Sequence, residues 1–214
     1  NLTDPAKRSI NRAIGEMSQG GDGTGARGRL KALGATKDVT DVFSRSLLPF
    51  VVEHLLGGPI LRHKPHGQIA LRFPGDFCQP PGSFNAPYLA QHLTHWHIDG
   101  CATDHAPDQQ HYGTIKNFSV LVGVLLSDVA APVSGELVAF PGSHDALARH
   151  LAQPGELQRV RDQGARALPT GPERTAALFQ RPPHHCVGRK GDAFLLNYMT
   201  APTIAHVRVV YVYA

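Results

Sequence analysis

The stretch QHLTHWHIDG, residues 91–100, alternates in the manner of a β-strand and holds the densest set of metal-capable side chains in the sequence. Successive side chains of a strand point to opposite faces, so Trp96 and Ile98 are expected to pack behind the polar residues. The polar face carries His95, His97 and Asp99. A neutral imidazole and a carboxylate two positions apart can each offer a lone pair to one cation. The pattern therefore predicts metal ligands on this strand.

Strand patterns continue on both sides of this stretch, from about residue 68 to the end of the chain. Residues 68–73 alternate between polar and apolar side chains, and residues 118–126 form a continuous apolar run, as in a strand buried on both faces. Further strands are expected within residues 135–140, 193–199 and 207–213. Since helical signals come first and strands follow, the order predicts a mainly β fold, a barrel or sandwich of antiparallel strands with helices packed outside.

The first 60 residues carry the helical signals. Asp4 is expected to cap a helix whose apolar residues recur at helical spacing up to Met17. Residues 41–56 form a second helical pattern, which Pro49 should kink or shorten. Gly57 and Gly58 then end it.

Three segments after the central strands are less regular. Ser143 follows a Pro-Gly turn and is expected to cap a helix that carries Leu147 and Leu151. Residues 153–181 mix helical and loop signals and receive no assignment. His184 and His185 lie among prolines and are expected in an exposed loop.

The composition is that of a globular chain. The 214 residues are 42% hydrophobic and 18% charged, which predicts a single domain with one core. No apolar run approaches membrane-spanning length, so no membrane association is expected. The net charge of +4 is scattered along the chain, which favours small anionic substrates over nucleic acid. The three cysteines have no CxxC spacing, so a reducing compartment such as the cytoplasm is expected.

A metal site on the 91–100 strand needs a further ligand from a distant strand, and His206 is the leading candidate. Arg208 follows two residues later, which is roughly 6.5–7 Å along one face of a strand. An imidazole on the metal and a guanidinium beyond it could hold the two ends of a small dicarboxylate, because the planar fork of arginine pairs with carboxylates. The alternative is that His206 is a solvated turn residue and Arg208 a charge at the rim of the barrel.

Other polar residues are secondary candidates. His95 is expected to hydrogen-bond near the metal, or to contact substrate, rather than to bind the metal itself. Gln68 and Arg72 share a face of the first strand and could reach a bound anion, or could form an ordinary polar face. Cys101 and Cys186 have no identifiable base and are not expected to act as nucleophiles.

The order of these motifs resembles that of the phytanoyl-CoA dioxygenase-like family of iron(II)- and 2-oxoglutarate-dependent oxygenases. The matching segments are WHID (96–99), LSD (126–128), GELVAFPGSH (135–144) and GDAFL (191–195). The resemblance implies a double-stranded β-helix, that is, a jelly-roll, cupin-like barrel over residues 68–214, with the helical residues 1–60 packed on it. It implies iron(II) held by His97, Asp99 and a distal histidine, here His206, and 2-oxoglutarate held by Arg208. It also implies hydroxylation of a small organic substrate with dioxygen, as 2-oxoglutarate is decarboxylated to succinate.

The tail of the chain departs from that family pattern. Pro202 stands where the family has its distal histidine, and His206 comes late, close to Arg208. The strand could be re-registered, the site could be incomplete, or a loop could be absent from this sequence. A second hypothesis is therefore a catalytically inactive binding protein of the same fold that has lost the third metal ligand. A third is a metal-dependent hydrolase that uses His95, His97 and Asp99.

Overall fold

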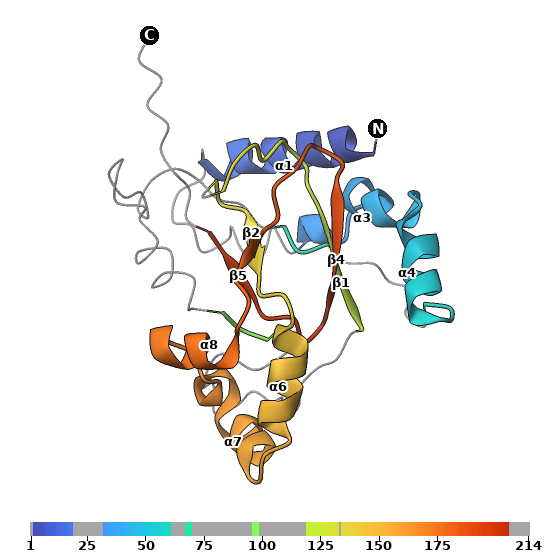
Figure 1. Cartoon of the computed structure of the whole chain (residues 1–214). Coiled ribbons are helices and arrows are strands. Elements are labelled where there is room, and N and C mark those ends of the chain that lie inside the picture. Colours follow the sequence, from blue (N-terminus) through green and yellow to red (C-terminus); the bar gives the residue numbers. More distant parts are fainter. Residues whose placement is uncertain are drawn as a thin grey trace. The chain divides into compact units, whose positions relative to one another are not determined.

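A computed structural model describes residues 2–18, 32–60, 67–69, 96–98, 119–132 and 134–205 (Figure 1). The chain divides into two units, and each is described by itself. Unit 1 comprises Asn1–Leu71, Gly123–Asp128 and Gly188–Ala193. Unit 2 comprises Arg72–Val122, Val129–Val187 and Phe194–Ala214.

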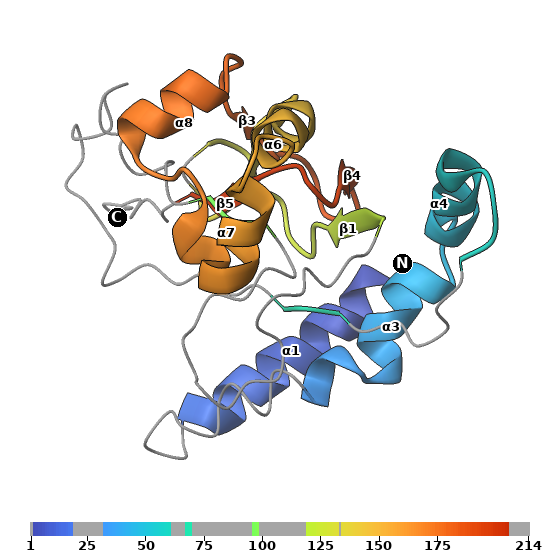
Figure 2. The same ribbon diagram turned by 90° about the horizontal axis from the view of Figure 1, so that it is seen from below.

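Unit 1 begins with the predicted helix, α1 (Thr3–Ser18), which packs beside α3 (Lys37–Ser44) (Figure 2). Ala6 and Ile10, two of the residues at helical spacing, are buried. Ser9 Oγ donates a hydrogen bond of 2.5 Å to Asp38 Oδ2 on α3. The amphipathic pattern of this helix is thus confirmed, and its first turn begins at Thr3, one residue before the expected cap.

Residues 41–56 form parts of two helices rather than one kinked helix. After α3 ends, the chain turns and restarts as α4 (Leu48–Leu56), with Pro49 in the first turn. Proline is tolerated at that position, because the first backbone N–H groups of a helix have no partner within the helix. Gly57 ends α4 in the left-handed conformation with φ of 69°, which confirms the predicted stop.

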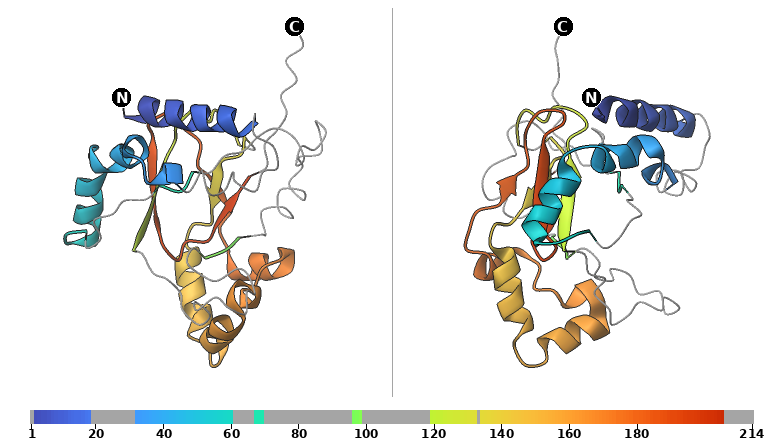
Figure 3. Two further views of the ribbon diagram at one scale, coloured as in Figure 1. Left: turned by 180° about the vertical axis from the view of Figure 1, so that it is seen from behind. Right: turned by 90° about the vertical axis from the view of Figure 1, so that its right-hand side faces the viewer.

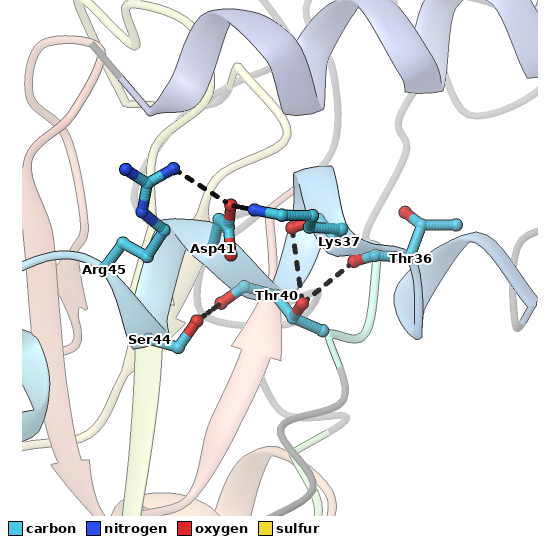
Figure 4. Close-up of polar contacts among 6 residues, drawn as sticks. All are labelled: Thr36, Lys37, Thr40, Asp41, Ser44 and Arg45. Carbon is cyan, nitrogen blue, oxygen red and sulfur yellow. Dashed lines mark hydrogen bonds and ion pairs between the residues drawn. The ribbon is translucent and has the colours of Figure 1, made fainter.

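The exposed side of α3 is organised around one carboxylate (Figure 4). Lys37 Nζ pairs with Asp41 Oδ2, and Arg45 Nη1 lies 3.5 Å from the same oxygen. The hydrogen bond from Lys37 is the main cause that lowers the pKa of Asp41. Thr40 Oγ1 donates to the carbonyl oxygen of Thr36 at 3.0 Å, within the helix. Both cations of this helix therefore share a single anion.

Three segments that are far apart in the sequence meet in unit 1. Leu125 N donates to the carbonyl oxygen of Asp192 at 2.9 Å, beside the predicted Gly-Asp turn. Lys190 joins the other two segments, since its backbone N–H donates to Asp128 Oδ1 at 2.7 Å and its Nζ to Asp4 Oδ1 at 2.8 Å. The hydrogen bond from Lys190 is the main cause that lowers the pKa of Asp4.

The described strands form two small sheets. β1 (Val120–Val124) pairs with β4 (Ala193–Asn197), and a second sheet has the order β3 (His184–His185), β2 (Leu137–Ala139), β5 (Pro202–Ile204). Strands were predicted at β1, β2 and β4 but not at β5, which lies between two predicted strands, nor at β3, where an exposed loop was expected. That expectation is wrong for His185, which pairs with Val138 and is half-buried. β1 is half-buried throughout rather than buried on both faces.

Helices gather at one end of the β3-β2-β5 sheet (Figure 3). They are α6 (Ser143–Leu151), α7 (Glu156–Gln163), the 3-10 turn η1 (Gly164–Ala167) and α8 (Pro172–Leu178). Together with the sheet they enclose the core of unit 2, in which Leu147 and Val138 have no exposed surface. The capping role predicted for Ser143 is wrong, because Gly142 is the N-cap and no side chain caps this helix. Ser143 Oγ instead accepts a hydrogen bond of 2.8 Å from Ala201 N.

The prediction of a mainly β, double-stranded β-helix fold is wrong. The described part of the chain is 45% helix and only 15% strand, in small antiparallel sheets, and these residues form no barrel. The physical reason lies in residues 143–178, where apolar side chains such as Leu147 and Val160 recur on helix faces and are buried. The strand predicted over residues 207–213 and most of the 91–100 stretch lie outside the described residues. The single domain expected for the whole chain stays a prediction. In the part of the chain that the structure describes, no helix has the length and apolar character to cross a bilayer.

Candidate functional site

Residues 96–98 confirm the alternation predicted for the centre of the motif. Trp96 and Ile98 are buried in the core of unit 2, and His97 between them is half-buried. Trp96 Nε1 donates a hydrogen bond of 2.9 Å to Thr175 Oγ1 on α8, and its ring lies 5.0 Å from that of Phe179. The two buried neighbours therefore hold the backbone of His97 against the core.

His97 lies beside β5. Its backbone N–H donates to the carbonyl oxygen of Pro202 at 3.3 Å, and Pro202 pairs with Ala139 of β2. Residues 96–98 are not themselves a strand of this sheet. Ala201 and Ala205 belong to the same core as Trp96 and Ile98, so by alternation Pro202 and His97 both point away from that core. The residue next to His97 on the neighbouring strand is thus a proline, whose side chain has no atom that can bind a metal.

Of the predicted site residues, only His97 and Gln68 belong to the described part of the chain. Gln68 is exposed and belongs to unit 1, whereas His97 belongs to unit 2. The others, which lie outside the described residues, are His95, Asp99, His206, Arg208 and Arg72. Across the described ranges, no group of three histidine, cysteine, aspartate or glutamate residues is placed to hold a metal ion. The iron(II) and 2-oxoglutarate sites therefore stay predictions.

A buried carboxylate next to β2 is a feature that sequence reasoning missed. The side chain of Glu136 has no exposed surface; its Oε2 accepts a hydrogen bond of 2.7 Å from Ser134 N, and its Oε1 pairs with Nδ1 of His185. The imidazole is 17% exposed. A glutamate between Gly135 and an apolar strand was the only signal in the sequence, and it does not identify the distant partner.

The Glu136–His185 pair lies on the face of the sheet that carries the helices. Ala205 N donates to the carbonyl oxygen of Glu136 at 2.9 Å, which extends the β2–β5 ladder by one residue. Glu136, Val138 and His185 consequently share the core face of this sheet. A carboxylate on one ring nitrogen fixes the orientation of an imidazole. Here it ties β3 to β2 within the core of unit 2.

Cys186 follows this pair and is buried. Its backbone N–H donates to the carbonyl oxygen of Leu137 at 2.9 Å. Burial, and then the negative charge of Glu136, raise the pKa of the Cys186 thiol to about 11. At neutral pH this side chain is a protonated thiol, which is a poor nucleophile.

Comparison of the chain with protein-family models, with curated proteins and with solved structures gives no match. The resemblance to the phytanoyl-CoA dioxygenase-like family accordingly rests on the sequence motifs alone.

Proposed function

We propose that the protein is an iron(II)- and 2-oxoglutarate-dependent oxygenase that hydroxylates a small organic substrate. The observation that carries the proposal is the position of His97 within the ordered set of family-like motifs. Its side chain alternates with Trp96 and Ile98, which anchor the backbone in the core. A metal ligand works best on backbone that its surroundings hold rigid. The local structure at His97 has that property.

Each proposed site residue has one role. His97 and Asp99 bind the metal through an imidazole nitrogen and a carboxylate oxygen, and His206 supplies the third ligand. Arg208 pairs with the far carboxylate of 2-oxoglutarate, for which a guanidinium is the best-matched partner. Iron(II) bound there would supply the activation of dioxygen, at a coordination position that the protein leaves open. His95 would orient ligands by hydrogen bonding.

Anaerobic titration with iron(II), followed by 2-oxoglutarate and then air, tests this proposal. We expect a visible charge-transfer absorption on addition of 2-oxoglutarate, and release of succinate and carbon dioxide in air. The His97→Ala variant should bind iron at least about tenfold more weakly, as expected for loss of a ligand. The matched control is His150→Ala, since His150 lies on α6 in the same unit and is not a proposed ligand. Absence of both the absorption and succinate formation in the unmodified protein would reject the oxygenase.

One observation favours the second candidate, a binding protein without turnover. Pro202 of β5 lies beside His97, whose backbone N–H donates to its carbonyl oxygen, and it offers no side-chain ligand. If the site is incomplete because a proline replaces the third ligand at position 202, Pro202→His should tighten iron(II) binding by about tenfold or more. If His206 is the third ligand, Pro202→His should leave the affinity unchanged and His206→Ala should abolish it. The two variants together separate the enzyme from the inactive relative.

A further inference from the structure

Trp96, the residue before the proposed ligand His97, is held by one turn of helix at the end of α8. Its indole Nε1 donates a hydrogen bond of 2.9 Å to Thr175 Oγ1, although the two residues are 79 positions apart in the sequence. The indole ring also lies 5.0 Å from the ring of Phe179, centroid to centroid. Because Phe179 N donates to the carbonyl oxygen of Thr175 at 2.8 Å, these two residues are one helical turn apart and contact Trp96 from the same side of α8.

The hydroxyl of Thr175 gives the indole N–H a hydrogen-bond acceptor inside the core of unit 2. Trp96 is only 3% exposed and Thr175 only 5% exposed, so water has little access to replace this bond. Contact between apolar rings has no strong direction, whereas a buried N–H group that loses its acceptor is costly. The hydrogen bond therefore fixes the rotation of the indole, which packing against Phe179 alone does not.

The constraint on Trp96 passes along the backbone to His97. The N–H group of His97 donates to the carbonyl oxygen of Pro202 at 3.3 Å, slightly beyond the usual range of about 2.7–3.2 Å. Ile98, on the other side of His97, is 1% exposed and belongs to the same core as Trp96. The position of the His97 backbone consequently depends more on the two buried side chains that flank it than on its own hydrogen bond to β5.

We propose that Thr175 is a positioning residue for His97, an assignment that rests on the proposed role of His97 as a metal ligand. By fixing the indole of Trp96, the Thr175 hydroxyl sets where the next residue lies and where its imidazole points. Metal ligands have to be held within about 0.5 Å of their working geometry. Because Thr175 lies in the core and His97 points away from it, the hydroxyl acts through Trp96 and not on the metal.

Amide hydrogen exchange of the full chain, followed by NMR, tests the positioning role without any metal. Thr175→Val keeps the shape of the side chain but removes the acceptor for the indole N–H. We expect the His97 amide to exchange about tenfold faster relative to the amide of Cys186, which donates to the carbonyl oxygen of Leu137 in the neighbouring sheet. The ratio of the two rates cancels any loss of stability that affects the whole unit. Thr175→Ser keeps the hydroxyl and should restore the ratio.

Two further variants separate positioning from a general weakening of the core. Val160→Ala is the matched control, because Val160 is a buried side chain of the same core on α7, and it should leave the exchange ratio unchanged. In a Trp96→Phe background the donor is absent, so Thr175→Val should add less than about a twofold change. An unchanged ratio in Thr175→Val, the same change in Val160→Ala, or an equal effect of Thr175→Val with and without the indole would overturn the proposal.

Anaerobic titration with iron(II) then connects Thr175 to the proposed metal site. Thr175→Val should weaken iron(II) binding about fivefold, less than the tenfold or more expected when a ligand loses its own hydrogen-bond partner. It should also shift the charge-transfer absorption of the 2-oxoglutarate complex, and Thr175→Ser should restore both properties.

The two measurements distinguish failure of this proposal from failure of the oxygenase. If the unmodified protein binds no iron(II), the oxygenase is rejected, and the exchange ratio still decides whether Thr175 positions His97. If the unmodified protein binds iron(II) and Thr175→Val changes neither the affinity nor the absorption, the positioning role is rejected and the oxygenase stands.

Discussion

The helices α4 and α6 are both nine residues long, yet they use their apolar residues in opposite ways. α4 is apolar on almost every side and buries only Val52. α6 is more polar and buries Ser143, Ala146 and Leu147. Ala146 and Leu147 lie on one side of the helix, where the β3-β2-β5 sheet and the neighbouring helices provide a partner. Burial is therefore decided by a matching surface within the chain rather than by apolar content.

Truncation of one leucine on each helix should give the largest difference in the free energy of unfolding. Leu147→Ala is expected to lower the free energy of unfolding by about 3 kcal/mol, because it removes a fully buried side chain and leaves a cavity. Leu55→Ala should change it by less than about 0.5 kcal/mol, since the side chain is mostly solvated. Urea denaturation followed by circular dichroism measures both. Equal losses for the two variants would show that α4 is buried within the chain.

The contrast between buried and exposed side chains extends to ion pairs. Breaking the buried Glu136–His185 pair should have the second-largest effect on the free energy of unfolding. His185→Ala removes the imidazole from the fully buried carboxylate of Glu136. We expect a loss of about 2 kcal/mol, less than for a wholly buried pair because the imidazole is partly exposed. The double variant Glu136→Gln, His185→Ala should recover part of the loss in the same denaturation experiment. If the double variant recovers no stability, the unpaired charge of Glu136 is not the cause of the loss in His185→Ala.

Burial of Cys186 should produce a smaller effect that depends on pH. Its pKa is raised from 9.0 to about 11, so the folded state favours the protonated thiol. The stabilisation is complete below pH 9.0 and is lost as the pH rises towards about 11. The stability of the unmodified protein relative to Cys186→Ala should fall by at most about 2 kcal/mol across this range, since one pKa unit corresponds to about 1.4 kcal/mol. A constant difference would contradict the raised pKa.

Removal of the exposed ion pairs of α3 should have the smallest effect on stability. The pKa of Asp41 is lowered chiefly by Lys37, so any stabilisation is present above its usual value of 3.8 and is lost as the pH falls through the folded-state value. Since solvent screens the pair, Asp41→Asn should leave the thermal midpoint at neutral pH unchanged within error. A clear drop in the midpoint, abolished by added salt, would show that these charges act as a network.

Local signals in the sequence predicted several elements correctly. α1 follows from apolar residues at helical spacing, the end of α4 from Gly57, and β2 and β4 from short apolar runs next to glycines. In the site, the burial of Trp96 and Ile98 on either side of His97 follows from period-two alternation. These features depend on neighbouring residues alone, which is why they can be read from one sequence.

Features that depend on distant residues could not be predicted in this way. The pairing of Glu136 with His185 and the bond from Ala201 to Ser143 join strands and helices whose order gives no hint of their contact. The helices after Leu151 were not assigned, because their apolar residues are sparse and reveal a buried face only once the sheet is present. The mainly β prediction failed for the same reason.

The segments that Lys190 joins have a consequence for synthesis on the ribosome. Unit 1 combines Asn1–Leu71 with Gly188–Ala193, about 120 residues later. At roughly 5–20 residues per second, those residues take on the order of 10 s to be added. Throughout that interval α1 lacks the lysine that pairs with Asp4. Unit 1 is therefore completed only after Lys190 has been added, and its first helices wait until then for the residues that join them.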